Sequence, residues 1–159
     1  MKLALVTSSG LSHPDSDLSL LVSELAGLDI DTDIVAWDDS VEWSAYDAAI
    51  VRSTWDYHRR LAEFDHWLTV VSTQTQLWNP ADLIRWNADK RYLADLSAKG
   101  LPTVPTHFID RTEPQWHSQL ASAGDDIVIK PTVGAGSRGV RRFTNQFEGA
   151  IAYVEDLLS

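Results

Sequence analysis

The sequence has 159 residues, of which 44% are hydrophobic and 23% are charged, so it is long enough to form one globular domain or two small ones. A net charge of −10 argues against a nucleic-acid-coating protein, which needs a basic face. No apolar run approaches the roughly 20 residues of a membrane span, and the absence of cysteine excludes disulfides, thiolate catalysis and cysteine zinc sites. We therefore expect a cytoplasmic protein with neither a nucleic-acid nor a membrane partner.

The first half of the chain alternates between strand-like and helix-like segments. Short apolar runs predict strands at 2–7, 31–37, 48–51 and 76–78. Apolar residues at helical spacing predict helices at 15–27 and 59–73. Alternation of this kind implies right-handed crossovers and a mostly parallel sheet. Residues 1–84 are therefore predicted to form a Rossmann-like α/β domain, with a boundary between Asn79 and Asn87.

A different pattern begins after this boundary. Apolar positions at helical spacing predict a helix from Asn87 to Lys99, which Gly100 and Pro102 would end. Residues 103–109 are strand-like in composition. Pro105 interrupts them, which favours a position at the edge of a sheet.

The rest of the chain combines two helices with two strands. Helices are predicted from Pro114 to Ala123 and from Phe147 to Leu158. Capping boxes would open them, formed by Thr112 with Gln115 and by Asn145 with Glu148. Strands are predicted at 127–130 and 140–143, and the short loop between them implies a hairpin. Residues 85–159 are therefore predicted to form an α+β unit.

The most informative segment is the loop of this hairpin, together with Lys130 at the end of its first strand. The loop contributes Gly134, Ala135, Gly136, Ser137, Arg138 and Gly139. Its glycines permit positive φ and let phosphate oxygens approach the backbone amides, while the serine adds a hydroxyl donor and the arginine a planar cation. Lys130 shares a strand face with Val128, so its ammonium would leave the sheet beside the loop. The pattern favours a nucleotide-phosphate site over a glycine-rich turn with a solvated lysine.

Two other phosphate-binding patterns fit the loop poorly. The dinucleotide-binding pattern G-x-G-x-x-G follows a strand and opens a helix, whereas here Pro131 follows the strand and a second strand-like run follows the loop. A Walker A loop ends in Gly-Lys-Ser or Gly-Lys-Thr, which is missing. The remaining interpretation is a hairpin loop whose amides fold over phosphates, as the glycine-rich flap of protein kinases does.

Two stretches of the sequence resemble the ATP-grasp superfamily. They are Asn79-Pro80 with 86–93 and 100–106, and Ile129-Lys130-Pro131 with the glycine loop. Within the superfamily, residues 49–57 and 78–80 are similar to a subgroup near glutathione synthetase and the cyclo-ligase of the cycloserine pathway. The resemblance implies a Rossmann-like pre-ATP-grasp domain over residues 1–84, followed by the first α+β ATP-grasp subdomain over residues 85–159.

The resemblance also implies a reaction. ATP would phosphorylate a carboxylate to an acyl phosphate, and an amine or thiol would then displace the phosphate. Lys90, on the predicted helix, and Lys130 would contact the nucleotide phosphates together with the glycine loop. The implied cofactors are ATP and Mg²⁺, and the partners are a nucleotide and a small carboxylate substrate, with a homodimer left open.

Candidate substrate residues follow two of the predicted strands. Arg52 comes directly after the strand at 48–51, at the sheet edge where ligands bind, and a guanidinium can hold a carboxylate through two hydrogen bonds. Ser53 and Asp56 follow it, and Ser8 comes after the first strand. The alternative role of Arg52 and Asp56 is a local salt bridge.

The resemblance covers the whole chain but only the first half of the family's pattern. The Mg²⁺ ligands and most of the adenine pocket are therefore expected in a second subdomain that this sequence lacks. Three interpretations stay open at this point. The chain is part of an ATP-dependent carboxylate ligase and inactive alone, or a short protein that binds a nucleotide or anion without turnover, or a dinucleotide-binding oxidoreductase domain.

Overall fold

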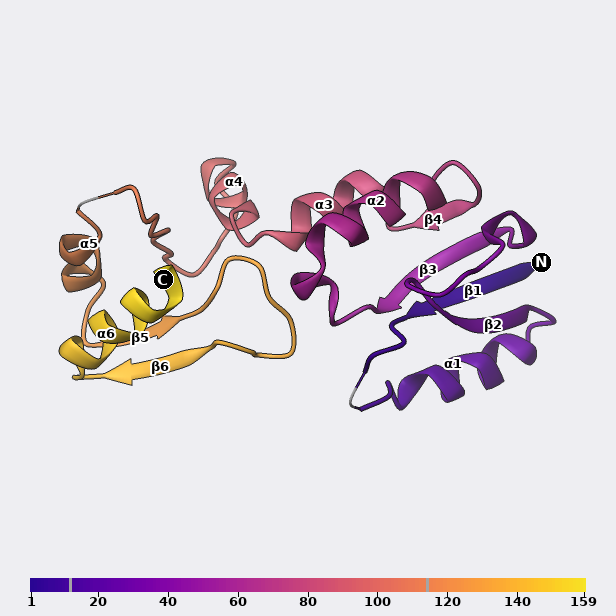
Figure 1. Ribbon diagram of the computed structural model, residues 1–159, viewed down its shortest axis with the longest axis horizontal. Helices are drawn as coiled ribbons and strands as arrows, with labels where there is room; N and C mark the ends of the chain where they lie inside the picture. Colours follow the sequence, from indigo (N-terminus) through magenta and orange to yellow (C-terminus); the bar gives the residue numbers. More distant parts are fainter. Residues whose placement is uncertain (12, 114) are drawn as a thin grey trace. The chain divides into compact units, whose positions relative to one another are not determined.

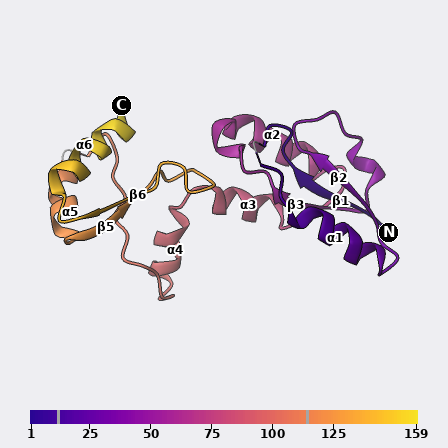
Figure 2. The ribbon, with the colours of Figure 1, turned by 90° about the horizontal axis from the view of Figure 1, so that it is seen from below.

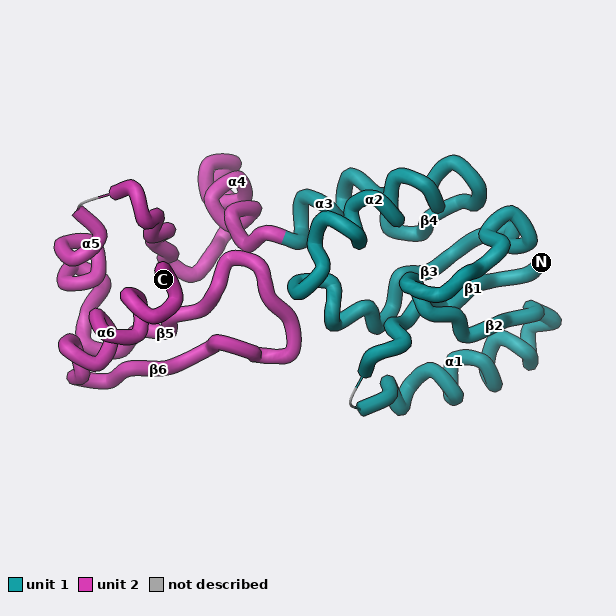
Figure 3. Tube along the Cα trace, in the orientation of Figure 1, with its two compact units in different colours: residues 1–88 teal, residues 89–159 magenta. Residues whose placement is uncertain are grey.

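The computed structural model describes residues 1–11, 13–113 and 115–159. It divides into two compact units, Met1–Ala88 and Asp89–Ser159 (Figure 3). The first contains a parallel sheet with helices, and the second contains an antiparallel hairpin with helices (Figure 1). The mixed α/β class predicted from the sequence is confirmed. No helix in the described ranges has both the length and the apolar character needed to cross a bilayer.

A four-stranded parallel sheet forms the centre of the first unit. Its strands are β1 (Lys2–Thr7), β2 (Asp31–Ala36), β3 (Ala48–Ser53) and β4 (Gln76–Trp78), in the order β2-β1-β3-β4. Its helices are α1 (Asp17–Ala26), α2 (Leu61–Val71) and α3 (Ala81–Ala88), with 3₁₀ turns η1 (Trp43–Ala45) and η2 (Tyr57–Arg59). In Figure 1, α1 lies on one side of the sheet and α2 on the other. The predicted strands and the first two helices of this unit are confirmed.

Aromatic side chains fill the core between the sheet and α2. Trp67 lies near the centre of this cluster, with its ring centroid 5.2 Å from that of Phe64, 5.5 Å from that of Trp43 and 6.2 Å from that of Trp37. The four rings are buried with Leu68 and Val71 of α2, which are 1% and 0% exposed. The tryptophans among them therefore serve mainly as packing, and Trp37 also reaches the edge of the sheet where polar residues gather.

The second unit is organised around the hairpin of β5 (Asp126–Ile129) and β6 (Arg141–Thr144), which pair antiparallel. Helices α5 (Trp116–Ser122) and α6 (Phe147–Leu158) lie beside this hairpin in both Figure 1 and Figure 2. Helix α4 (Tyr92–Ala98) precedes them in the chain. The core of the unit consists of Trp116, Leu120, Phe143, Ala150, Tyr153 and Val154, with Ile127 and Ile129 packed against it. Because the isoleucines of β5 face this core, Val128 faces outward.

The helix predicted from Asn87 to Lys99 is confirmed over its second half, as α4, but its predicted start is wrong. Asn87 lies near the end of α3 rather than at a helix start, and the next helix begins at Tyr92. Between the two, Asp89 pairs with Val133 in an antiparallel bridge and the backbone N–H of Lys90 donates to the Thr132 carbonyl at 2.9 Å. Lys90 therefore lies in a turn that is tied to the glycine loop, because a distant segment takes the hydrogen bond that helix continuation would need.

Three further local predictions also differ from the structure. Residues 103–109 form no strand, which is consistent with the missing N–H of Pro105. Neither capping box forms, since the helix N-caps are Gln115 and Gln146, without side-chain cap bonds. Thr112 instead bonds to Asp110. The predicted helix start at Pro114 falls outside the described residues.

The burial of each leucine side chain predicts how much it contributes to the free energy of unfolding of the first unit. We expect Leu68→Ala to lower the free energy of unfolding by about 2–5 kcal/mol, because it opens a cavity in the aromatic core. Leu20→Ala makes the same chemical change on α1 at a position that is 66% exposed, and we expect a change within about 0.5 kcal/mol. Urea unfolding followed by tryptophan fluorescence measures both. Equal losses for the two variants would contradict this packing.

Candidate functional site

Lys90 is anchored to the first half of the glycine loop. Its ammonium donates to the carbonyls of Thr132 at 3.2 Å and Gly134 at 3.1 Å. The backbone N–H of the same lysine also bonds to Thr132. An ammonium has three donors, so these two bonds leave one available for a ligand. Lys90 thus holds the loop through two ammonium hydrogens and can bind a ligand through the third.

The two predicted phosphate-binding lysines lie close enough for their charges to interact. Burial lowers the pKa of Lys90 below its ordinary value of 10.5, and the positive charge of Lys130 lowers this pKa further, while Asp89 acts in the opposite direction. Lys130 is exposed and forms no hydrogen bond or ion pair with any residue that the structure describes. Two neighbouring cations, one partly desolvated, favour the binding of an anion.

The tip of the loop presents backbone amides to solvent. Gly136, Ser137 and Gly139 have φ values of 60°, 57° and 67°, in the left-handed region. Their N–H groups donate to no acceptor within the described part of the chain. Successive amides in such a conformation form a concave donor surface for anions. The arginine at the tip, Arg138, is exposed and forms no ion pair with a described residue.

The loop joins two antiparallel strands, β5 and β6. It does not lead into a helix after the first strand of a βαβ unit, which dinucleotide binding requires. The structure therefore brings Lys90, Lys130 and the glycine loop together in an arrangement that differs from a dinucleotide site.

One residue beside the loop had no role in the sequence analysis. Tyr153 of α6 donates its hydroxyl hydrogen to the Gly139 carbonyl at 2.8 Å. No sequence signal identifies this contact, because a tyrosine on an amphipathic helix is ordinarily read as a core residue.

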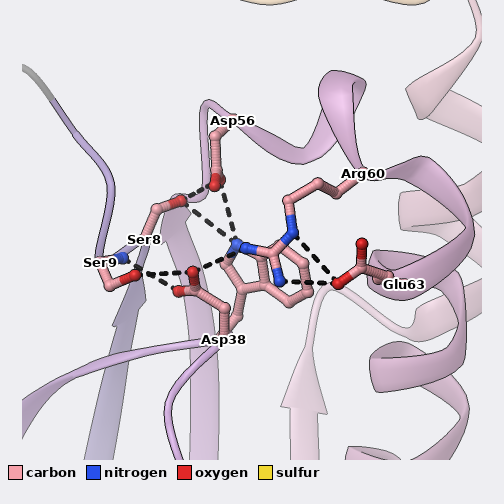
Figure 4. A network of polar contacts seen from close by, with 7 residues as sticks. Ser8, Ser9, Asp38, Asp56, Arg60 and Glu63 are labelled. Atoms are coloured by element: carbon pink, nitrogen blue, oxygen red, sulfur yellow. Dashed lines mark hydrogen bonds and ion pairs between the residues drawn. The ribbon is translucent and has the colours of Figure 1, made fainter.

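Polar residues gather separately at the carboxyl edge of the parallel sheet in the first unit (Figure 4). The Ser8 hydroxyl donates to Asp56 Oδ1, and Trp37 Nε1 donates to the same carboxylate oxygen at 3.1 Å and to Ser8 Oγ at 3.2 Å. Two of the predicted substrate residues, Ser8 and Asp56, are therefore in direct contact. The bonds from Ser8 and from Trp37 both go to Oδ1 of Asp56, so Oδ2 can accept a hydrogen bond from a ligand.

A second carboxylate, Asp38, lies beside this group. Ser9 donates to Asp38 from its backbone N–H at 3.0 Å and from its hydroxyl at 2.7 Å, and Arg60 pairs with Asp38 at 2.8 Å. Burial raises the pKa of Asp38, but the bonds from Ser9 and Arg60 outweigh burial and hold this pKa below its ordinary value of 3.8. Arg60 also stacks over the Trp37 ring at 4.6 Å and pairs with Glu63, so both charges are internally compensated.

The structure places Arg52 at the same edge but pairs it with the start of α1. Its guanidinium forms ion pairs with Asp15 at 3.3 Å and Asp17 at 3.0 Å. The alternative salt bridge with Asp56 is absent among the described residues, because Asp56 bonds to Ser8 and Trp37 instead. The Arg52 side chain is 40% exposed, so a carboxylate ligand can reach it only in competition with two aspartates.

Ser53 is the least accessible of the predicted substrate residues. It is 0% exposed, and its hydroxyl donates to Thr7 Oγ1 at 3.1 Å, across the β1–β3 pair. This bond joins the end of β1, which precedes Ser8, to the end of β3, which contains Arg52. In this structure Ser53 therefore supports the sheet edge from within.

A cavity of about 330 Å³ opens beside the ends of β3 and β4. Thr54, Tyr57, Asn79 and Asn87 contribute neutral polar groups to its wall, and Val51 and Phe64 contribute apolar surface. It lies where ligands bind in parallel α/β sheets. Among the described residues, no three histidines or carboxylates are grouped so that they could hold a metal ion.

Comparison with known proteins agrees with this architecture. A family model described as "D-cycloserine synthetase DcsG, N-terminal domain" matches residues 3–79. The cycloserine biosynthesis protein DcsG of Streptomyces lavendulae is 35% identical over 168 aligned residues, which cover 99% of this chain and 55% of that protein. The crystal structure of D-cycloserine synthetase DcsG matches with a TM-score of 0.87 at 35% identity, over 99% of this chain and 56% of the other.

This chain is similar over nearly its whole length to part of DcsG, and its fold is that of ATP-grasp proteins. A RimK-domain ATP-grasp protein from Sphaerobacter thermophilus matches with a TM-score of 0.73 at 19% identity, over 99% of this chain and 60% of that one, which is a likeness of fold. The chain spans about half the length of the curated relative that it matches. The ATP-grasp resemblance that the lysines and the glycine loop indicated is therefore confirmed.

The position of Lys90 predicts its titration. We expect its pKa to lie below 10.5, and we expect Lys130→Met to raise it partway, because the like charge is removed while burial remains. Between the folded pKa and 10.5 the unfolded chain binds more protons at this site, so the contribution of Lys90 to the free energy of unfolding increases with pH across that window. NMR of ¹³C-labelled lysine measures the pKa. A value at or above 10.5, or one that Lys130→Met leaves unchanged, would contradict the arrangement.

Proposed function

We propose that this chain supplies the ATP-phosphate site of an ATP-dependent carboxylate–amine or carboxylate–thiol ligase that acts through an acyl phosphate. The observation that carries the proposal is the placement of Lys90 and Lys130 beside a glycine loop whose tip amides are unpaired among the described residues. The relation to the ATP-grasp ligases supports it. On this proposal, Asp89–Ser159 acts as the first ATP-grasp subdomain and Met1–Ala88 as the pre-ATP-grasp domain.

The donor set suits a triphosphate. The phosphates of ATP carry several negative charges, and two ammonium groups together with the amide dipoles of the loop can offset them. Lys90 is partly desolvated and adjacent to another cation, so its charge is unfavourable in the free protein. An anion between the lysines would remove that penalty and would raise the pKa of Lys90 again.

The chain's own residues would bind and orient, with little covalent chemistry. Lys130 would pair with a phosphate from the strand end, and Lys90 would use its remaining donor from the loop side. The loop amides, with Ser137 and Arg138, would cover the terminal phosphates and exclude water. When bound, ATP with Mg²⁺ would supply the phosphoryl group that activates a carboxylate.

We infer that the small carboxylate substrate binds at the carboxyl edge of the first unit. Asp56 offers a free carboxylate oxygen there, Ser8 orients this carboxylate through its hydroxyl, and Arg52 offers the cation. Binding a substrate carboxylate would require Arg52 to exchange Asp15 or Asp17 for the ligand. Ser53 would hold the edge together without touching the substrate.

Substitution of Lys130 tests the proposed phosphate site. We expect Lys130→Ala to weaken binding of MgATP to the full chain by about 10- to 100-fold, because a charge-assisted bond to phosphate contributes about 1.5–3 kcal/mol. Lys99→Ala is the matched control, since it removes the same charge from an exposed position in the same unit. Isothermal titration calorimetry measures both, with circular dichroism to check folding. Equal affinity in the two variants would remove Lys130 from the site, and a wild-type chain that binds no MgATP would contradict the proposal.

A further inference from the structure

The two ends of the glycine loop are closed against each other by three residues. Gly139, where the chain returns, has a φ of 67°. A Cβ atom at that position would lie 2.9 Å from Cγ and 3.0 Å from Cδ of Pro131, the residue at the other end of the loop. Only glycine fits against the proline ring at this distance. Tyr153 completes the closure, because its hydroxyl donates to the Gly139 carbonyl at 2.8 Å.

Tyr153 is itself held firmly by the core of the second unit. Its side chain is 7% exposed, and its ring centroid lies 5.8 Å from that of Phe143 on β6. The guanidinium of Arg141 also lies over the Tyr153 ring, 4.3 Å from the ring centroid. The tyrosine therefore presents its hydroxyl from a packed ring, so the position of the oxygen is fixed by the core.

The tip of the loop contrasts with this base. Within the tip, two turn bonds are formed, from the Arg138 N–H to the Ala135 carbonyl and from the Val140 N–H to the Ser137 carbonyl, each at 3.2 Å. Residues 136–138 are exposed. The loop thus has a fixed base, at Pro131 and Gly139, and a weakly held tip. The hydrogen bond from Tyr153 to Gly139 marks the point where the chain leaves the tip and enters the base again.

We propose that Tyr153 is a positioning residue for the phosphate loop. Its hydroxyl fixes the Gly139 carbonyl, and the contact of Gly139 with Pro131 transmits that position to the adjacent Lys130. The loop amides and Lys130 are thereby held ready for one polyphosphate anion, and Tyr153 itself does not touch the anion. This inference rests on the proposed function for the identity of the ligand, but the positioning of the loop can be measured without any ligand.

The Tyr153→Phe variant removes the hydroxyl and keeps the packed ring. In the unliganded full chain, we expect the hydrogen-bonded loop amides of Arg138 and Val140 to exchange hydrogen about 10-fold faster than in the wild type, with exchange in α5 and the middle of α6 unchanged. We expect MgATP and inorganic tripolyphosphate each to bind about 5- to 20-fold more weakly. Tyr46→Phe is the matched control, because it deletes a tyrosine hydroxyl that donates to Asp33 at 2.9 Å in the first unit, and should alter neither measurement.

A second variant keeps the test decisive if the first folds poorly. Gly139→Ala leaves Tyr153 intact but forces a Cβ against Pro131, and we expect the same local pattern of faster exchange. Unchanged loop exchange in both variants would overturn the inference. Faster exchange spread evenly over the second unit would also overturn it, because that result indicates a purely structural role. Local loosening in a chain whose wild type binds neither probe would uphold the positioning of the loop and refute the proposed ligand.

Discussion

The hydrogen bonds between Lys90 and the loop carbonyls are the interaction on which the candidate site depends. They hold the first half of the glycine loop, through Thr132 and Gly134, against the turn between α3 and α4. They also withdraw the ammonium from water and place it near Lys130, which is why the pKa of Lys90 is lowered. Lys90 therefore ties the backbone of the first half of the loop and also contributes to the local electrostatic field.

The constraint continues on the other side of the loop. Tyr153 holds the returning strand at Gly139, and the glycine packs on Pro131, so the loop is fixed at its base and loosely held at its tip. A loop of this kind can keep the two lysines beside its amides while its tip moves to cover a ligand. In the first unit the same division appears at the sheet edge, where Ser53 is buried and holds the strands, while Arg52 remains partly exposed.

The sequence predicted the elements whose signals are local. The parallel strands of the first unit, the first two helices and the hairpin around the glycine loop follow from short apolar runs and turn residues, and the loop with Lys130 indicated the family. The predicted start of the helix from Asn87 to Lys99 is wrong because the Lys90 N–H bonds to Thr132, far along the chain, which periodicity cannot reveal. Arg52 bonds to Asp15 and Asp17 for the same reason: side-chain partners are chosen by the fold. The role of Tyr153 likewise depends on where α6 packs.

The claim that the lysines and the glycine loop form one triphosphate site can be tested by amide NMR of the full chain titrated with MgATP, and separately with NAD. We predict saturable shifts of the Gly136, Ser137 and Gly139 amides with MgATP, together with a shift of the Lys90 ammonium, and no comparable response to NAD. A titration in which MgATP leaves these signals unmoved, or in which NAD alone moves them, would contradict the account.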